Sequence, residues 1–272
     1  MSEGTDYGSV DGLSVVLDDA VLRLTLTRAE KRNALDDSMM SGLIDALDRA
    51  GRDEAVRCVL LTSSGDHFCG GADIVARNAP KDERPRVGSI QRRVPSTAHR
   101  LIPLIGSVQV PVVCAVRGSV VGIGFQLALA ADFTVAATDA RFWEPFVERG
   151  FTPDSGATWM LPRLVGPARA RELLLLGRSL DGTEAAAWGL VHRAVEPAQV
   201  DAVAGELVDR LAAGPTVALG LTKWLVHAGA EADLDAQLRN EAFALELSSR
   251  SDDFREGLAA FVEKRPPDFT GR

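Results

Sequence analysis

The sequence predicts a layered α/β domain with parallel strand pairing, followed by a helical C-terminal region. Short apolar runs typical of buried strands occur at 56–62, 111–117 and 133–137. A glycine-rich turn and then a helical segment come after each of the first two runs. After about residue 155, helical patterns rich in Ala, Leu and Arg dominate. The repeated order of strand, glycine turn and helix is typical of an α/β core.

The individual elements follow from local patterns in chain order. Residues 13–27 alternate as two strands around the turn Asp18-Asp19, and Asp37-Ser38 begins a helix that runs to about Ala50. Residues 75–97 are charged and contain three prolines, so we expect a mobile loop or a broken helix there. Further helices are expected at 98–108, 156–177, 183–189, 197–212, 215–228, 233–249 and 251–264.

Length and composition indicate a globular chain and exclude some partners. The 272 residues are 46% apolar and 25% charged, as in an average folded domain. The net charge of −8, without a long basic run, argues against a nucleic-acid partner. Cys58, Cys69 and Cys114 share no CxxC spacing, so we expect neither a disulfide framework nor a metal site, and a cytoplasmic location. No apolar run reaches the ~18 residues of a membrane span.

Two glycine turns, Cys69-Gly70-Gly71-Ala72 and Gly122-Ile123-Gly124, are candidates for a binding site. The second is not a dinucleotide fingerprint, because the third glycine and the distant acid are absent. Turns of this kind can instead expose N–H groups at a helix N-terminus. Two facing turns would supply two donors to one oxygen, an oxyanion hole worth roughly 3–4 kcal/mol per donor. Each pair can equally be a simple tight turn, and the turns alone leave both interpretations open.

The chain as a whole resembles the crotonase superfamily, the enoyl-CoA hydratase/isomerase family, over about residues 13–271. The resemblance rests on LTRAEKRNAL (26–35), HFCGGADI (67–74), PVVCAVRGSVVGIGFQLALAAD (111–132), TPDSGATWMLPRLVG (152–166) and SDDFREGLAAFVEKRPPDFTGR (251–272). It implies a crotonase-like spiral of ββα units with a helical C-terminal trimerisation region, an acyl-CoA thioester as substrate, and a homotrimer or dimer of trimers. It implies no cofactor and no metal, because coenzyme A is part of the substrate.

The resemblance also implies a division of the chain and a set of site residues. Residues 1–12 are a flexible leader, 13–200 the α/β spiral core, and 201–272 a helical region for oligomerisation and for covering CoA. The N–H groups of Ala72 and Ile123 form the oxyanion hole, and Lys264 reaches the adenine end from a neighbouring subunit. The full set implied to bind the substrate is Arg32, Asn33, Ala34, Leu35, Gly70, Gly71, Asp73, Ile74, Gly122, Gln126, Phe146 and Lys264.

The acids distinguish between the reactions of this family. Its hydratases use two glutamates, and Gln126 and Phe146 stand at those positions here, which puts two-glutamate hydration in doubt. Asp154 matches the acid of some family isomerases, so we expect it to move a proton from C2 to C4 while the oxyanion hole holds the dienolate. Phe146, Phe151 and Trp159 are expected to bury Asp154 and make it a stronger base. The plain alternative is that Asp154 caps the following helix.

Other functions stay open at this stage. Hydration could use non-standard acids such as Asp154 or Glu148, although Glu144 and Glu148 are more typical of solvated surface acids. His99 matches a histidine base of the family's 4-chlorobenzoyl-CoA dehalogenases, so His99 with Asp154 would support hydrolysis through an ester. His99 can equally be a packing or capping residue. The absence of both glutamates also suggests a non-catalytic acyl-CoA-binding protein.

Overall fold

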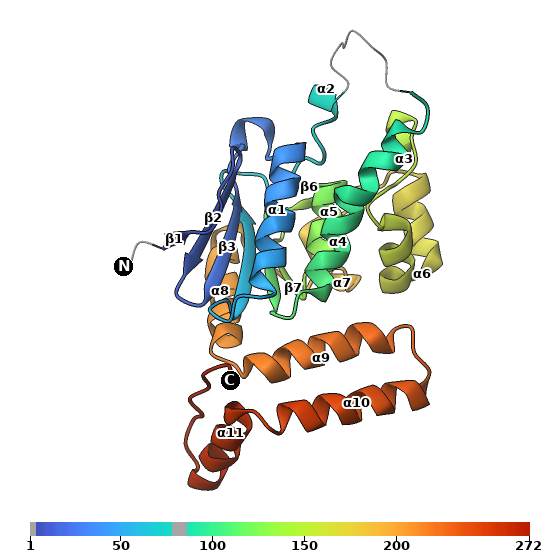
Figure 1. The fold of residues 1–272 in the computed structure, drawn as a ribbon. Coiled ribbons are helices and arrows are strands. Elements are labelled where there is room, and N and C mark those ends of the chain that lie inside the picture. The colour runs from blue at the N-terminus through green and yellow to red at the C-terminus, as the bar shows by residue number, and fades with distance from the viewer. Residues whose placement is uncertain (1–3, 78–85) are drawn as a thin grey trace.

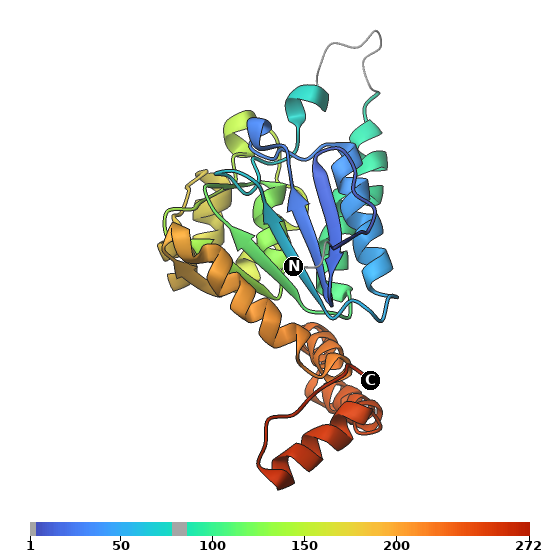
Figure 2. The ribbon, with the colours of Figure 1, turned by 90° about the vertical axis from the view of Figure 1, so that its left-hand side faces the viewer.

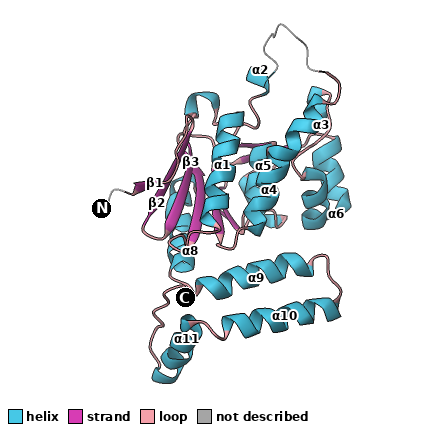
Figure 3. Cartoon of the chain, in the orientation of Figure 1, coloured by secondary structure: helices cyan, strands magenta, loops and turns pink. Residues whose placement is uncertain are grey.

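The computed structural model describes residues 4–77 and 86–272. Within these residues, seven strands form one sheet in the order β1-β2-β3-β4-β5-β7-β9, and β6 pairs with β8 in a separate two-stranded sheet (Figures 1 and 3). β1, β2 and β3 pair antiparallel, and every other neighbouring pair is parallel. The strands are β1 (Thr5–Asp6), β2 (Leu13–Asp18), β3 (Val21–Leu26), β4 (Cys58–Ser63), β5 (Val112–Val116), β6 (Ser119–Val121), β7 (Phe133–Ala137), β8 (Arg141–Trp143) and β9 (Arg193–Val195).

Helices cover both faces of the large sheet (Figure 2). On one face α1 packs on β2 and α4, and α4 packs on α5, whereas α8 packs against β4, β5 and β7. The α-helices of this part are α1 (Asp37–Ala50), α2 (Ile74–Arg77), α3 (Ser89–Arg93), α4 (Ala98–Ser107), α5 (Ile123–Ala130), α6 (Ala157–Leu175), α7 (Gly182–Ala187) and α8 (Val200–Ala212). The short 3-10 helices are η1 (Ala29–Lys31), η2 (Val94–Ser96), η3 (Val147–Arg149) and η4 (Pro197–Gln199).

The layered α/β core with parallel pairing is confirmed, with local differences. The two strands expected over 13–27 are β2 and β3, and the helix expected from Asp37 to Ala50 is α1. Asp36 rather than Asp37 caps that helix, because its side chain accepts from the Met39 N–H. The helix expected over 156–177 is broken at Gly166, whose φ of 76° lies outside helical geometry. The segment expected to be a loop or broken helix contains α2, α3 and η2, and its residues 78–85 lie outside the described residues.

Two expected domain boundaries differ from the structure. Part of the leader expected at 1–12 is packed on the core, since β1 pairs with β2 and the buried Tyr7 donates its hydroxyl to Asp53 at 2.8 Å. Residues 1–3 lie outside the described residues. The α8 helix belongs to the core, because Val200, Ala204 and Val208 are buried. The helical extension therefore begins after α8 and not at residue 201.

The C-terminal extension consists of α9 (Thr216–Gly229), α10 (Leu234–Ser248) and α11 (Asp252–Glu263), and it projects from one end of the sheet (Figures 1 and 2). Helix α9 is fixed to the core by the buried Lys223. Its ammonium donates to the Ile105 carbonyl at 2.9 Å, to the Val110 carbonyl at 3.2 Å and to Asp132 Oδ2 at 2.7 Å. Burial lowers the pKa of Lys223 and the charge of Asp132 opposes that shift. None of the described helices combines the length and apolarity that crossing a bilayer requires.

Removal of the Lys223 charge should destabilise the fold. Lys223→Met leaves the Asp132 carboxylate in a largely buried site with the Val112 N–H as its remaining partner, so the free energy of unfolding should fall by about 3–5 kcal/mol. Urea denaturation followed by circular dichroism measures the change. The control Arg250→Gln breaks an exposed pair with Glu246 and should change stability by less than about 1 kcal/mol. Equal losses in the two variants would contradict the anchoring role.

Candidate active site

The two glycine turns of the sequence lie side by side in the structure. Cys69 and Val120 form an isolated parallel bridge next to β6. The Cys69 N–H donates to the Ser119 carbonyl and the Val121 N–H donates to the Cys69 carbonyl, both at 2.9 Å. The turn that follows β4 is therefore joined by backbone hydrogen bonds to the turn that begins α5.

The glycines permit this close approach. Gly71 has a φ of +102° and Gly122 a φ of +53°, values that favour glycine. At Gly124 a Cβ atom would lie 2.6 Å from the Cβ of Cys69, so a larger residue would push α5 away from the first turn. The spacing of the sequence motif did not reveal this packing role of Gly124, because the contact joins residues 55 positions apart.

Two backbone amides at these turns are free. Ile123 is the first residue of α5, where an N–H has no partner within the helix. Within the described part of the chain, neither the Ile123 N–H nor the Ala72 N–H donates to a protein acceptor. Their neighbours are used internally, since Gly122 donates to the Trp143 carbonyl at 3.0 Å and Asp73 to the Leu35 carbonyl at 2.8 Å. Two unused donors on adjacent turns are suited to an oxygen ligand.

The segment 32–35 lies against the first turn. The Gly70 N–H donates to the Arg32 carbonyl at 2.7 Å, and Leu35 bridges to Ala72 in parallel fashion. Asn33 is fully buried and donates to the Ser64 and His67 carbonyls, and Leu35 is fully buried as well. The side chains of Asn33 and Leu35 are therefore part of the packing of the turn. Arg32 is exposed and Ala34 is half-buried.

Asp73 is held by ion pairs beside this turn. Its carboxylate accepts from Arg28 at 3.1 Å and lies 3.9 Å from the Lys31 ammonium. Ile74 begins the short helix α2. The carboxylate of Asp73 is thus engaged in holding the first turn in place.

Asp154 is exposed, which differs from the sequence prediction. Phe146 is buried, but the exposed fractions of Phe151 and Trp159 are 42% and 47%, so this aromatic group does not enclose the carboxylate in a single chain. The helix-cap alternative is also wrong. Gly156 is the N-cap of α6 without a side-chain hydrogen bond, and Asp154 Oδ1 instead accepts from the Ser155 hydroxyl at 2.8 Å.

The prediction that Glu144 is a solvated surface acid is wrong. Glu144 is 1% exposed and not a solvated surface residue. Gln126 Nε2 donates to Glu144 Oε1 in a short contact, which joins α5 to the segment after β8. Burial raises the pKa of Glu144 well above its ordinary value of 4.5; the hydrogen bond from Gln126 opposes this shift and the charge of Asp154 adds to it. Burial therefore favours the protonated form of Glu144, and the charge of Asp154 acts in the same direction.

Three other predicted residues lie apart from the glycine turns. Glu148 is exposed and lies against Gly177. Lys264 ends α11, and Figures 1 and 2 place α11 at the opposite end of the molecule from α2. A role of Lys264 at this site therefore needs a second subunit. His99 is exposed on α4 and lines a separate cleft.

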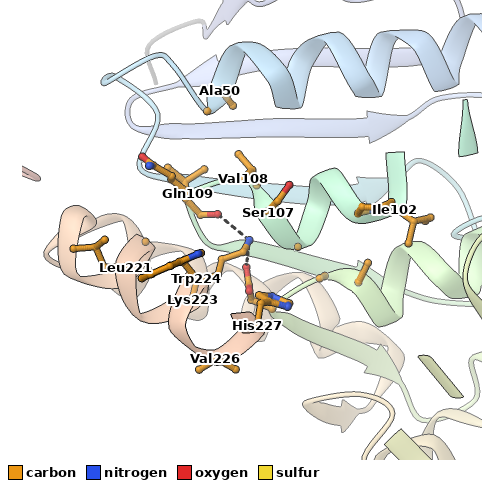
Figure 4. A pocket seen from close by; sticks show the side chains of 18 of the residues that line it. Ala50, Ile102, Ser107, Val108, Gln109, Leu221, Lys223, Trp224, Val226 and His227 are labelled. Carbon is orange, nitrogen blue, oxygen red and sulfur yellow. Dashed lines mark hydrogen bonds and ion pairs between the residues drawn. The ribbon is translucent and has the colours of Figure 1, made fainter. Parts of the chain in front are cut away.

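That cleft has a volume of about 1770 Å³ and separates the C-terminal extension from the core. Figure 4 shows Lys223, Trp224 and His227 of α9 facing Ser107 and Val108 at the end of α4. Its lining includes Ser155 and Gly156 but none of Ala72, Ile123, Glu144 and Asp154. Among the described residues His99 makes no hydrogen bond to Asp154, and no group of three or more His, Cys, Asp or Glu side chains is placed to hold a metal ion.

The pattern of motifs and the fold agree with comparisons to known proteins. A model of the enoyl-CoA hydratase/isomerase family matches residues 17–272. The chain belongs to this family, the crotonase superfamily. This crotonase-family enzyme is 40% identical over 254 residues to the 1,2-epoxyphenylacetyl-CoA isomerase of Escherichia coli K12, an alignment that covers 93% of this chain and 95% of the relative.

Other relatives carry different activities in their names. The crotonyl-CoA hydratase of Syntrophomonas wolfei is 34% identical to this crotonase-family enzyme over 251 residues, with 92% of this chain and 94% of the relative covered. The crystal structure of an enoyl-CoA hydratase from Bacillus anthracis superposes with a TM-score of 0.88 at 30% identity and covers 96% of this chain and 100% of that one. The expected crotonase-like fold is thereby confirmed.

The buried Glu144 should give this crotonase-family enzyme a distinct pH dependence of stability. Because its pKa is raised in the folded state, the folded protein holds a proton that the unfolded chain releases above about pH 4.5. The free energy of unfolding therefore falls as pH rises toward the folded-state pKa, by at most about 1.4 kcal/mol per pH unit. Glu144→Gln removes this titration, so the stability of the variant relative to wild type should increase as the pH rises above about 4.5.

Denaturant titrations at each pH measure this difference. Glu246→Gln is the matched control, because Glu246 is exposed on α10. A stability difference between Glu144→Gln and wild type that stays constant across the range would show that Glu144 is ionised in the folded protein.

Proposed function

We propose that the protein isomerises the double bond of an enoyl-CoA thioester. The free N–H groups of Ala72 and Ile123, on turns joined by the Cys69–Val120 bridge, carry this proposal. They would bind the thioester oxygen and stabilise the negative charge that develops on it when C2 loses a proton. The coenzyme A arm would extend past Arg32 and the first turn, and the reaction requires no cofactor besides the CoA of the substrate.

Asp154 is the proposed acid and base. Burial raises the pKa of Glu144 well above its ordinary value and Phe146 cannot take a proton, so Asp154 is the carboxylate of this group suited to accept one. Asp154 would remove a proton from C2 of a 3-enoyl thioester to give a dienolate. Return of that proton at C4 would yield the conjugated 2-enoyl thioester, so atoms and charge balance with one base and one oxyanion site. The isomerase name of the Escherichia coli relative supports this choice.

Hydration is the second candidate, supported by the crotonyl-CoA hydratase among the relatives. The two reactions give opposite signals. Isomerisation of a 3-enoyl-CoA raises the absorbance of the conjugated thioester, and hydration of crotonyl-CoA lowers it. A protein that only binds acyl-CoA changes neither signal. Hydrolysis through His99 and Asp154 finds no support in the single chain, in which the two side chains make no contact among the described residues.

Loss of the Asp154 carboxylate should abolish turnover and spare binding. We expect Asp154→Asn to lower kcat for a 3-enoyl-CoA by about 10²–10⁴-fold, because the amide cannot accept the C2 proton. The Kd for butanoyl-CoA, measured by calorimetry, should change less than about threefold. Asp201→Asn, an exposed carboxylate paired with Arg117, is the control and should keep full activity. Unchanged turnover in Asp154→Asn would remove this residue from the mechanism.

We also propose that the chain assembles as a homotrimer or a dimer of trimers through α10 and α11. Both helices expose large apolar side chains that a soluble monomer rarely presents together. These are Leu234, Leu238, Phe243, Leu245, Leu247, Phe254, Leu258, Phe261 and Val262, each 49–80% exposed. Burial of this row would offset the loss of freedom on association. The cysteines are free and buried, which supports the proposal of a reducing, cytoplasmic compartment.

Disruption of the apolar row should shift the oligomeric state. Light scattering after size exclusion should give about three or six times the 29.0 kDa of one chain for the wild type. Phe261→Asp places a charge in the proposed contact and should reduce the mass toward that of a monomer. Asp201→Asn again serves as the control. A wild-type mass of one chain at micromolar concentration would contradict the assembly.

A further inference from the structure

The imidazole of His67 makes a hydrogen bond at the joint between the two glycine turns. Its Nδ1 accepts from the Ser119 N–H at 3.1 Å, and Ser119 is the first residue of β6. An acceptor needs a free lone pair, so Nδ1 carries no proton and the ring proton lies on Nε2. The side chain of His67 is half-buried, and the proposed isomerisation gives it no role.

This hydrogen bond continues the backbone pairing of the joint by one step. The Cys69 N–H donates to the Ser119 carbonyl, and the Val121 N–H donates to the Cys69 carbonyl, both at 2.9 Å. In regular parallel pairing, the next bond would join the Ser119 N–H to the His67 carbonyl. That carbonyl instead accepts from Asn33 Nδ2 at 2.7 Å, and the His67 side chain supplies the acceptor for Ser119.

The imidazole fits closely against the residue that precedes β6. Gly118 has a φ of +55°, and a Cβ atom there would lie 2.5 Å from His67 Nδ1. A larger residue would therefore displace the ring from Ser119. The Gly118 carbonyl accepts from the Arg141 N–H at 2.7 Å, which ties the same residue to β8. The place of the His67 ring and the path of the chain into β6 are thus determined together.

The segment that begins at Ser119 leads to the free amide of Ile123. β6 ends at Val121 and Gly122 is the N-cap of α5, so the amide lies four positions after Ser119. β8 pairs with one edge of this segment, and the first turn pairs with the other. Without the imidazole the Ser119 N–H would lose its acceptor, which is unfavourable for a backbone amide. The start of β6 would then be free to shift, and α5 with it.

We propose that His67 is a positioning residue, whose Nδ1 holds β6 in place and thereby fixes the Ile123 amide against the thioester oxygen. The inference rests on the proposed function in one respect, because that function makes the Ile123 amide a donor to this oxygen. Such a donor is effective only where charge develops in the transition state. A displacement of about 1 Å can lower a rate by about 100-fold. His67 would act through Ser119 and not by contact with the substrate.

Three substitutions separate the acceptor from the rest of the side chain. His67→Phe keeps a ring and removes the acceptor, and His67→Leu removes the acceptor with a smaller side chain. His67→Asn replaces Nδ1 by Oδ1, an acceptor bonded to the same side-chain carbon, Cγ. His192→Phe is the matched control, because His192 is exposed and its ring packs on Phe133 at the start of β7.

The first readout is the split between turnover and binding. We expect kcat for a 3-enoyl-CoA to fall about 10–100-fold in His67→Phe and His67→Leu, because the Ile123 amide is displaced. His67→Asn and His192→Phe should stay within about threefold of the wild type. The Kd for butanoyl-CoA should change less than about threefold in every variant, since the effect concerns the transition state. Full activity in His67→Phe or His67→Leu would overturn the proposal, and so would equal losses in His67→Leu and His67→Asn.

An infrared measurement separates this inference from the proposed function. Butanoyl-CoA with a heavy carbon isotope at the thioester carbonyl gives a distinct carbonyl stretch in difference spectra, and hydrogen bonds to the oxygen lower its frequency. We expect a lowered frequency in the wild type and in His67→Asn, and a smaller change in His67→Phe and His67→Leu.

The outcomes of this measurement are distinct. An equal lowering in all four proteins would reject the role of His67 and leave the oxyanion hole in place. No lowering in the wild type would reject the oxyanion hole, and with it both proposals. A lowering that depends on His67, in a protein without isomerase turnover, would reject the isomerisation alone and support the positioning role.

Discussion

The candidate site depends on the backbone pairing between Cys69 and Val120. This single parallel bridge joins the loop after β4 to the strand that leads into α5. Each of the two elements is fixed separately to the core, β4 by pairing with β3 and β5, and β6 by pairing with β8. The bridge brings the ends of these two systems together. Gly124 leaves room for Cys69, and Gly71 and Gly122 adopt the positive φ that the two turns require. The positions of the free amides at 72 and 123 follow from that contact.

The two acids Glu144 and Asp154 lie in different environments. Glu144 is enclosed by protein and has one hydrogen-bond partner, Gln126, so the neutral form is favoured. Asp154 is in contact with solvent and with the Ser155 hydroxyl. Pairs of acids whose surroundings differ in this way are common in active sites, since one can donate where the other accepts. Burial is the main cause of the raised pKa of Glu144, and the charge of Asp154 adds to it.

Much of the fold was predictable from local patterns, and the failures have physical reasons. Alternation over 13–27 and helical spacing over 37–50 each span enough residues to give a clear period. β8 and β9 are three residues long, which is too short for any period to appear. The burial of Glu144 could not be predicted, because WEPFVERG contains two glutamates that look alike in sequence and only the tertiary contact with α5 separates them. The exposure of Asp154 was missed because nearby aromatic residues in the sequence do not define which way each ring points.

The glycine turns themselves were predicted as a pair, but not the reason for their association. The sequence contains the two turns 50 residues apart and gives no sign of the Gly124–Cys69 contact between them. The charged anchor at Lys223 was likewise invisible, since a lysine in an amphipathic helix normally faces solvent.

The Lys223 anchor also has a mechanical consequence for the C-terminal arm. Three acceptors from the end of α4, the loop after it and Asp132 surround one ammonium group, so α9 cannot rotate or slide without leaving a bare charge in a low-dielectric interior. The Lys223 contacts therefore restrain α9, the first helix of the arm. If a neighbouring subunit binds to α10 and α11, its position relative to this sheet would depend on how the Lys223 ammonium holds α9.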